Sequence, residues 1–155
     1  MSTERNHAIG GGALQALADQ LRAEDTPIAP HVIDPAEPSH LGELAGGGEY
    51  ALVVEAVREG YLLHYEEPRL LAGHDSDLAL LAGDYLYALG LDRLATLEDT
   101  RAVAVLSDLI SDCARLQAEG ETAPIENLWR RAAEEIGSTS GKDDGSVTQV
   151  TAPNQ

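Results

Sequence analysis

The sequence is poor in aromatic residues and in cysteine. It contains no phenylalanine, and Trp129 and five tyrosines are its only aromatic residues. β-Sandwiches draw on aromatic and β-branched residues, whereas leucine, alanine and valine at helical spacing favour helices. The single cysteine, Cys113, excludes an internal disulfide framework. The composition therefore favours an all-α protein in a reducing compartment, with Cys113 as a small buried hydrophobic residue.

Long apolar runs are also missing. Nothing in the sequence approaches the ~18 consecutive apolar residues of a membrane-spanning helix, and the N-terminus shows no apolar run of signal-peptide length. We therefore expect a cytoplasmic protein with no membrane span. At 155 residues the chain has the length of one domain with a real core.

Basic residues are scarce. Ten Lys and Arg face 27 Asp and Glu, which gives a formal net charge of −17. Such a chain repels DNA, RNA and anionic lipid, so we expect no nucleic-acid partner. Excess acid commonly serves solubility, and the alternatives are a basic partner or bound cations. A diphosphate substrate would require metal ions or basic residues lent by a partner.

Apolar residues recur at helical spacing in five segments. We expect a flexible N-terminus over residues 1–12, a helical domain over 13–137 and a disordered Ser/Thr/Gly/Asp-rich tail over 138–155. Within the domain the proline-rich stretch 27–38 should be extended. The helices are expected at 13–22, 49–67, 77–94, 96–119 and 124–136.

Several helix ends are marked by particular residues. Pro68 should stop the second helix, Asp75 or Ser76 should cap the third, and Gly120 and Gly137 should close the last two. The third helix, 77–94, is apolar on nearly every side. That pattern predicts a central helix, and it is also compatible with a surface that meets a partner.

Gly60 and Gly83 lie inside predicted helices, where each costs about 1 kcal/mol relative to alanine. A missing side chain allows two helix axes to approach closely. We therefore predict that the second and third helices cross near these glycines. The alternative is that both are tolerated defects.

A group of carboxylates and imidazoles lies between the end of the second helix and the start of the third. Such side chains at helical spacing can hold Mg²⁺, Mn²⁺, Fe or Zn²⁺. No Glu-x-x-His motif of the di-iron type falls on any pair of the predicted helices, and no His-Glu-x-x-His motif is present. The alternative is that these residues are caps and exposed acids. The candidate metal ligands are Glu66, Glu67, His74 and Asp77.

Asp84 is placed unusually for a carboxylate. Its neighbours along the helix face, Leu81 and Ala88, are apolar, so we expect a buried polar group that needs a hydrogen bond or a cation. The candidate cations are Arg58, Arg69 and Arg93.

The segment Ala79-Leu80-Leu81-Ala82-Gly83-Asp84-Tyr85-Leu86 resembles the Ala-Ile-Leu-Ala-Gly-Asp-Tyr-Leu helix of trans-polyprenyl diphosphate synthases. The stretch 55–64 is similar in placement to the synthase helix that ends in the first aspartate-rich motif. The resemblance spans about residues 50–120. It implies a bundle resembling half of an isoprenoid synthase fold.

The synthase metal motif itself is absent. Where catalytic members carry Asp-Asp-x-x-Asp, this chain reads His64-Tyr65-Glu66-Glu67-Pro68-Arg69. Prenyl transfer needs about three Mg²⁺ ions, which this stretch cannot hold. We therefore expect no catalysis by this chain alone and no cofactor, with Mg²⁺ present only if a synthase-like partner supplies it.

The resemblance is closer to the small, non-catalytic component of heterodimeric heptaprenyl-type synthases. It implies a subunit of isoprenoid biosynthesis that acts through a protein partner or as a homodimer, with Gly83, Asp84 and Tyr85 at helix-packing positions. Two alternatives stay open: an acidic helical protein that binds metal or a small molecule, and a plain interaction or scaffold protein.

Overall fold

The computed structural model describes the backbone of residues 2–151 and the side chains of residues 12–138. Six α-helices and one short 3-10 helix make up this part of the chain, and it contains no strand beyond the isolated bridge between Val32 and Leu71. The all-α prediction is therefore confirmed. The elements are α1 (Ser2–Ala23), η1 (Ala29–His31), α2 (Leu41–Leu44), α3 (Gly48–Tyr65), α4 (Ser76–Thr96), α5 (Thr100–Glu119) and α6 (Ile125–Thr151).

The flexible N-terminus expected over 1–12 and the disordered tail expected over 138–155 fall outside the described side chains, apart from Gly12 and Ser138 themselves. Both expectations stay predictions.

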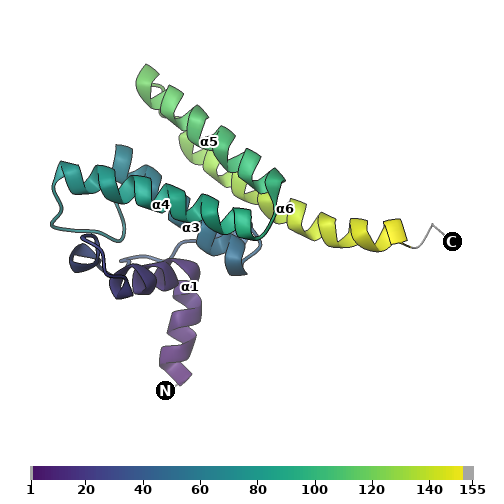
Figure 1. The fold of residues 1–155 in the computed structure, drawn as a ribbon, viewed down its shortest axis with the longest axis horizontal. Helices are drawn as coiled ribbons and strands as arrows, with labels where there is room; N and C mark the ends of the chain where they lie inside the picture. Colours follow the sequence, from purple (N-terminus) through teal and green to yellow (C-terminus); the bar gives the residue numbers. More distant parts are fainter. Residues whose placement is uncertain (1, 152–155) are drawn as a thin grey trace.

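The helices are arranged around an α3–α4 pair (Figure 1). α1 lies against one side of this pair, and the α5–α6 pair crosses its other side. The short α2 contacts both α3 and α6. Two apolar clusters result: one joins α1, α3 and α4, and the other joins α3, α5, α6 and the end of α4.

α3 is the central helix, because it packs against α1, α2, α4 and α6. Eleven of its 18 residues are buried, whereas only five of the 21 residues of α4 are. The expectation that residues 77–94 form the central helix is therefore wrong. Leu80 and Leu81 of α4 are 54% and 51% exposed. When a helix is apolar on every side, its sequence does not show which side packs against the rest of the chain.

The predicted caps are largely confirmed. The Asp75 carboxylate accepts a hydrogen bond from the backbone N–H of Leu78 at 2.8 Å, which caps α4. Gly120 ends α5 in the left-handed conformation, at φ 73°. α5 begins later than predicted, since the Asp99 carboxylate accepts from the N–H of Ala102 at 3.0 Å and so caps a helix that starts at Thr100.

Gly137 does not close α6 as predicted, because the helix continues through it. A Cβ at this position would lie 2.3 Å from the carbonyl oxygen of Leu44. The glycine therefore allows α6 to approach the end of α2 closely. A glycine that permits packing and one that ends a helix look alike in the sequence.

α3 and α4 meet at Gly60 and Gly83, where the sequence predicted their crossing. A Cβ on Gly60 would lie 2.9 Å from the Gly83 carbonyl oxygen, and one on Gly83 would lie 3.2 Å from that of Gly60. Two turns further along α4, a Cβ on Gly90 would lie 2.5 Å from a methyl carbon of Val57. The two helices are therefore so close at these positions that a Cβ atom on any of the three glycines would crowd the facing helix.

Candidate functional site

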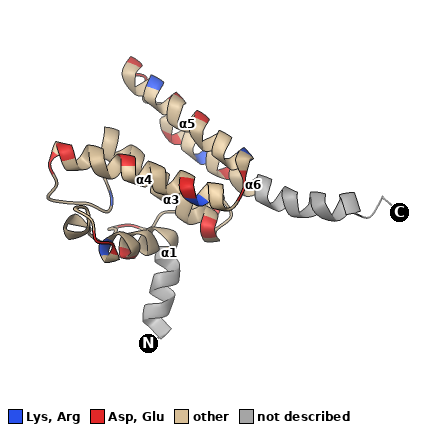
Figure 2. Ribbon diagram, in the orientation of Figure 1, with Lys and Arg blue, Asp and Glu red and all other residues tan. Residues whose placement is uncertain are grey.

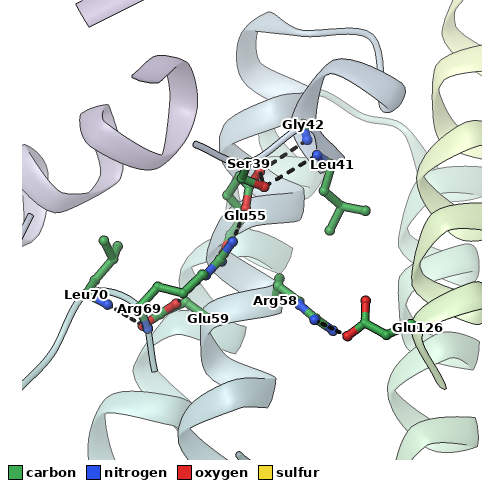
Figure 3. Close-up of polar contacts among 9 residues, drawn as sticks. All are labelled: Ser39, Leu41, Gly42, Glu55, Arg58, Glu59, Arg69, Leu70 and Glu126. Atoms are coloured by element: carbon green, nitrogen blue, oxygen red, sulfur yellow. Dashed lines mark hydrogen bonds and ion pairs between the residues drawn. The ribbon is translucent and has the colours of Figure 1, made fainter. Parts of the chain in front are cut away.

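Two glutamates of the central helix are buried. Glu55 and Glu59 of α3 are 1% and 0% exposed, and their spacing of one helical turn places them on the same side of the helix. A buried carboxylate is costly unless charged and neutral donors surround it. Figure 3 shows Glu59 beside the segment that follows α3, and Glu55 between Arg69 of that segment and Ser39.

Glu59 binds the backbone and side chain of that segment. Its Oε2 accepts hydrogen bonds from the N–H groups of Arg69 at 2.7 Å and Leu70 at 2.8 Å. Its Oε1 accepts from Nε of Arg69 at 2.9 Å. The carboxylate therefore holds the chain just after Pro68 against α3.

Glu55 joins a second segment to the same arginine. Its Oε1 accepts from Arg69 at 2.9 Å, and its Oε2 accepts from the hydroxyl of Ser39 at 2.5 Å and the N–H of Gly42 at 3.1 Å. All four carboxylate oxygens of the pair are engaged within the chain. This cluster of Ser39, Gly42, Glu55, Glu59 and Arg69 serves to position loops (Figure 3).

Arg58 links α3 to α6 on the opposite side. Its guanidinium forms an ion pair with Glu126 and lies over the rings of Tyr61 and Trp129, at 5.5 and 5.2 Å from the ring centroids. Attraction between a cation and a ring face adds to the ion pair. Arg58 and Arg69, two of the cations proposed for Asp84, are therefore engaged elsewhere.

Asp84 is not buried. Its side chain is 76% exposed, and its Oδ1 lies 3.1 Å from Nε2 of His64, whose own side chain is 17% exposed. The expected buried polar group is therefore wrong. The physical reason is that its apolar neighbours on the same helix face, Leu81 and Ala88, are themselves exposed.

His64 occupies the space that Gly83 leaves open. A Cβ at Gly83 would lie 2.5 Å from the His64 ring. The ring stacks on Tyr87, with centroids 5.3 Å apart and planes 10° from parallel. Gly60, Gly83 and Tyr87 thus form a tight contact between α3 and α4, with the pair of His64 and Asp84 at its solvent edge.

Tyr85 faces α1 rather than solvent. Its hydroxyl donates a hydrogen bond to Glu24 at 2.5 Å. This hydrogen bond, together with burial and the negative charge of Glu24, raises the pKa of Tyr85 to about 12. Tyr85 therefore packs within the chain, at the junction between α4 and the end of α1.

The proposed metal ligands do not meet. Glu66 accepts a hydrogen bond from the hydroxyl of Tyr61 at 2.8 Å, Glu67 and Asp77 are exposed, and His74 is half-buried. Across residues 12–138, no group of three or more His, Cys, Asp and Glu side chains is placed to hold a metal ion.

Cys113 and Tyr61 lie in the apolar cluster of α3, α5 and α6. Burial is the main reason that the pKa of Cys113 rises to about 11, so the thiol stays protonated at neutral pH. Burial also raises the pKa of Tyr61, whose hydroxyl accepts a hydrogen bond from Gln117 at 2.8 Å. Neither group is an activated nucleophile.

Large apolar side chains are exposed near the start of α4. Leu80 and Leu81 lie in the second turn of α4, and Tyr65, which is 42% exposed, lies at the adjoining end of α3. Scattered exposed leucines are common, but neighbouring ones often mark an interaction site. The apolar pattern on nearly every side of residues 77–94 was compatible with such a surface, but it was equally compatible with a buried helix.

Comparison with known proteins adds no assignment. No protein-family model matches the chain, and no curated protein or solved structure shows significant similarity to it. None of the helices in the described part is both long and apolar enough to cross a membrane.

Proposed function

We propose that this chain is a non-catalytic helical protein that acts by assembling with a protein partner, in the manner of the small component of heterodimeric prenyl diphosphate synthases. The observation that carries the proposal is the exposure of Leu80 and Leu81. Each is about half exposed, so covering both contributes roughly 1 kcal/mol per leucine. These leucines belong to the segment that resembles the synthase helix.

Residues 64–69, which would correspond to the synthase metal motif, make contacts within the chain. His64 pairs with Asp84, Glu66 binds Tyr61, and Arg69 holds the two buried glutamates. These side chains stabilise the fold instead of converging on a shared point. This supports a subunit that lacks its own diphosphate-processing site, with any Mg²⁺ held by the partner chain.

A cytoplasmic location and a place in isoprenoid biosynthesis belong to the same proposal. Their support is the single unpaired cysteine, typical of a reducing compartment, and the resemblance in residues 79–86.

Purification of the protein from its native host, followed by mass measurement of the intact complex, tests this function. We expect a heteromeric complex with a chain that carries two Asp-Asp-x-x-Asp motifs. Recovery of the free monomer alone would contradict the proposal.

A pair of variants then links assembly to the leucines. Leu81→Glu should weaken the complex by about tenfold or more, because it buries an unpaired charge at the contact. Leu97→Glu is the matched control, since Leu97 is 37% exposed just beyond α4. It should leave the complex unchanged within about twofold.

A further inference from the structure

Most of the exposed residues of α4 form one stripe along the helix. Their spacing of three or four residues, or multiples of it, returns to the same side of a helix with 3.6 residues per turn. We call this stripe the α4 face. Over residues 77–92 its exposed members are Asp77, Leu80, Leu81, Asp84, Ala88 and Asp92.

Acidic and apolar residues alternate along the α4 face. Asp77, Asp84 and Asp92 follow one another at intervals of seven and eight residues, which is about two helical turns. The apolar members lie between them. Figure 2 shows that the start of α4 is acidic, and Glu66 and Glu67, both exposed, follow the adjoining end of α3.

The nearby arginines do not neutralise this stripe. Arg69 binds Glu55 and Glu59, and Arg93 binds Glu49 and Gln20. Among the ion pairs of residues 12–138, the α4 face takes part only through Asp84 and the imidazole of His64. Its charge therefore remains available to a partner.

From this pattern we infer that the α4 face binds a basic amphipathic helix of a partner protein. Such a helix packs leucine-sized residues against Leu80 and Leu81 and places lysine or arginine two turns apart, opposite the three aspartates. Complementary charge of this kind determines register and excludes wrong partners. The inference rests on the proposed function, because it specifies the partner that the assembly requires.

Charge argues against the other occupants of this surface. A second copy of the chain would bring one aspartate stripe against another, and like charges at an interface are unfavourable. Anionic lipid and nucleic acid are repelled for the same reason. The surface therefore fits a basic protein segment.

Site-specific cross-linking in the native host tests the inference. The benzophenone-bearing amino acid p-benzoylphenylalanine replaces Leu81 in one full-length protein and Leu97 in a control, and the cross-linked peptide is sequenced after irradiation. We expect an adduct from position 81 only, on a helical segment with lysine or arginine at seven- or eight-residue intervals. An adduct with this chain's own peptides contradicts the inference.

Failure of the inference is distinguishable from failure of the proposed function. If the heteromeric complex is recovered but position 81 gives no adduct, the function stands and the α4 face is the wrong surface. If the protein is recovered only as a monomer, both are contradicted.

A designed peptide measures the charge contribution. The probe is an amphipathic helix of about 20 residues with leucines between lysines two turns apart, and the control peptide carries glutamate for lysine. The variant D77N/D84N/D92N should bind the lysine peptide about tenfold more weakly than the wild type. Equal binding of both peptides by the wild type contradicts the inference.

The matched control neutralises three exposed acids elsewhere, D25N/D108N/E121Q. It changes the net charge by the same amount and should alter the affinity by about twofold at most. An equal loss in both triple variants contradicts a specific α4 face, because it shows that only the net charge matters.

Discussion

α3 and α4 pack against each other, yet they place charged and apolar residues in opposite ways. α3 buries Glu55 and Glu59 almost completely, whereas α4 leaves Leu80 and Leu81 half exposed. By residue type alone the reverse is expected. The difference follows from position: α3 contacts α1, α2, α4 and α6, while α4 contacts mainly α3 and α5.

The comparison shows that location in a bundle decides burial as much as hydrophobicity does. A helix surrounded by neighbours can bury acids if nearby chain segments donate hydrogen bonds to them. A helix at the edge can expose leucines, and that exposure becomes favourable only when another molecule covers it. The predictions below test the two halves of this contrast.

Arg69→Ala should have the largest effect. It leaves two buried carboxylates without the arginine that pairs with both, and breaking a buried ion pair costs about 3–5 kcal/mol. The free energy of unfolding, measured by urea denaturation, should fall by that amount. Arg115→Ala removes an exposed arginine and should cost about 1 kcal/mol or less. Equal losses would show that the glutamates are not held by Arg69.

Truncation of leucines on the two sides of α4 comes next. Leu86 is fully buried, so Leu86→Ala should destabilise the isolated protein by about 2–5 kcal/mol. Leu81→Ala should change the isolated protein by about 0.5 kcal/mol at most, as surface substitutions do. Thermal or urea unfolding measures both. A large loss for Leu81→Ala would mean that the chain itself covers this residue.

Gly60→Ala tests the helix crossing through the sign of its effect. Helix propensity alone predicts a gain of about 1 kcal/mol. The new Cβ would lie 2.9 Å from the Gly83 carbonyl oxygen, and such overpacking costs about 1–3 kcal/mol. We expect a net destabilisation in urea unfolding. A more stable variant would mean that the two backbones are further apart.

Tyr85→Phe should have the smallest effect, visible at high pH. The pKa of Tyr85 is raised to about 12 in the folded protein, compared with about 10 for an ordinary tyrosine. The folded state therefore holds this proton more tightly, and its stabilising contribution is present below pH 10 and lost as the pH rises toward 12. Stability measured across this range should fall less steeply in Tyr85→Phe than in the wild type.

Much of the fold could be predicted because its signals are local. Asp75 and Gly120 mark helix ends by short-range hydrogen bonding and backbone conformation. Gly60 and Gly83 are costly inside helices, so a close crossing was the natural explanation. The prediction that Gly137 closes the last helix was wrong because its role is not local. This glycine packs against the end of α2, a segment about 90 residues earlier in the chain.

The buried glutamates were not predictable in the same way. Glu55 and Glu59 occur in a helix with other charged residues, where an acid is usually solvent-exposed. Their burial depends on donors that only the folded chain brings together, from Ser39, Gly42 and the segment at Arg69. Asp84 shows the converse, because apolar neighbours suggested burial on a face that the chain leaves open.

The mass of the native complex, compared between the wild-type protein and Leu80→Glu/Leu81→Glu, tests most directly whether the α4 face is a partner surface. The account predicts a heteromeric complex for the wild type and a free, folded monomer for the variant. An intact complex in both proteins would contradict it.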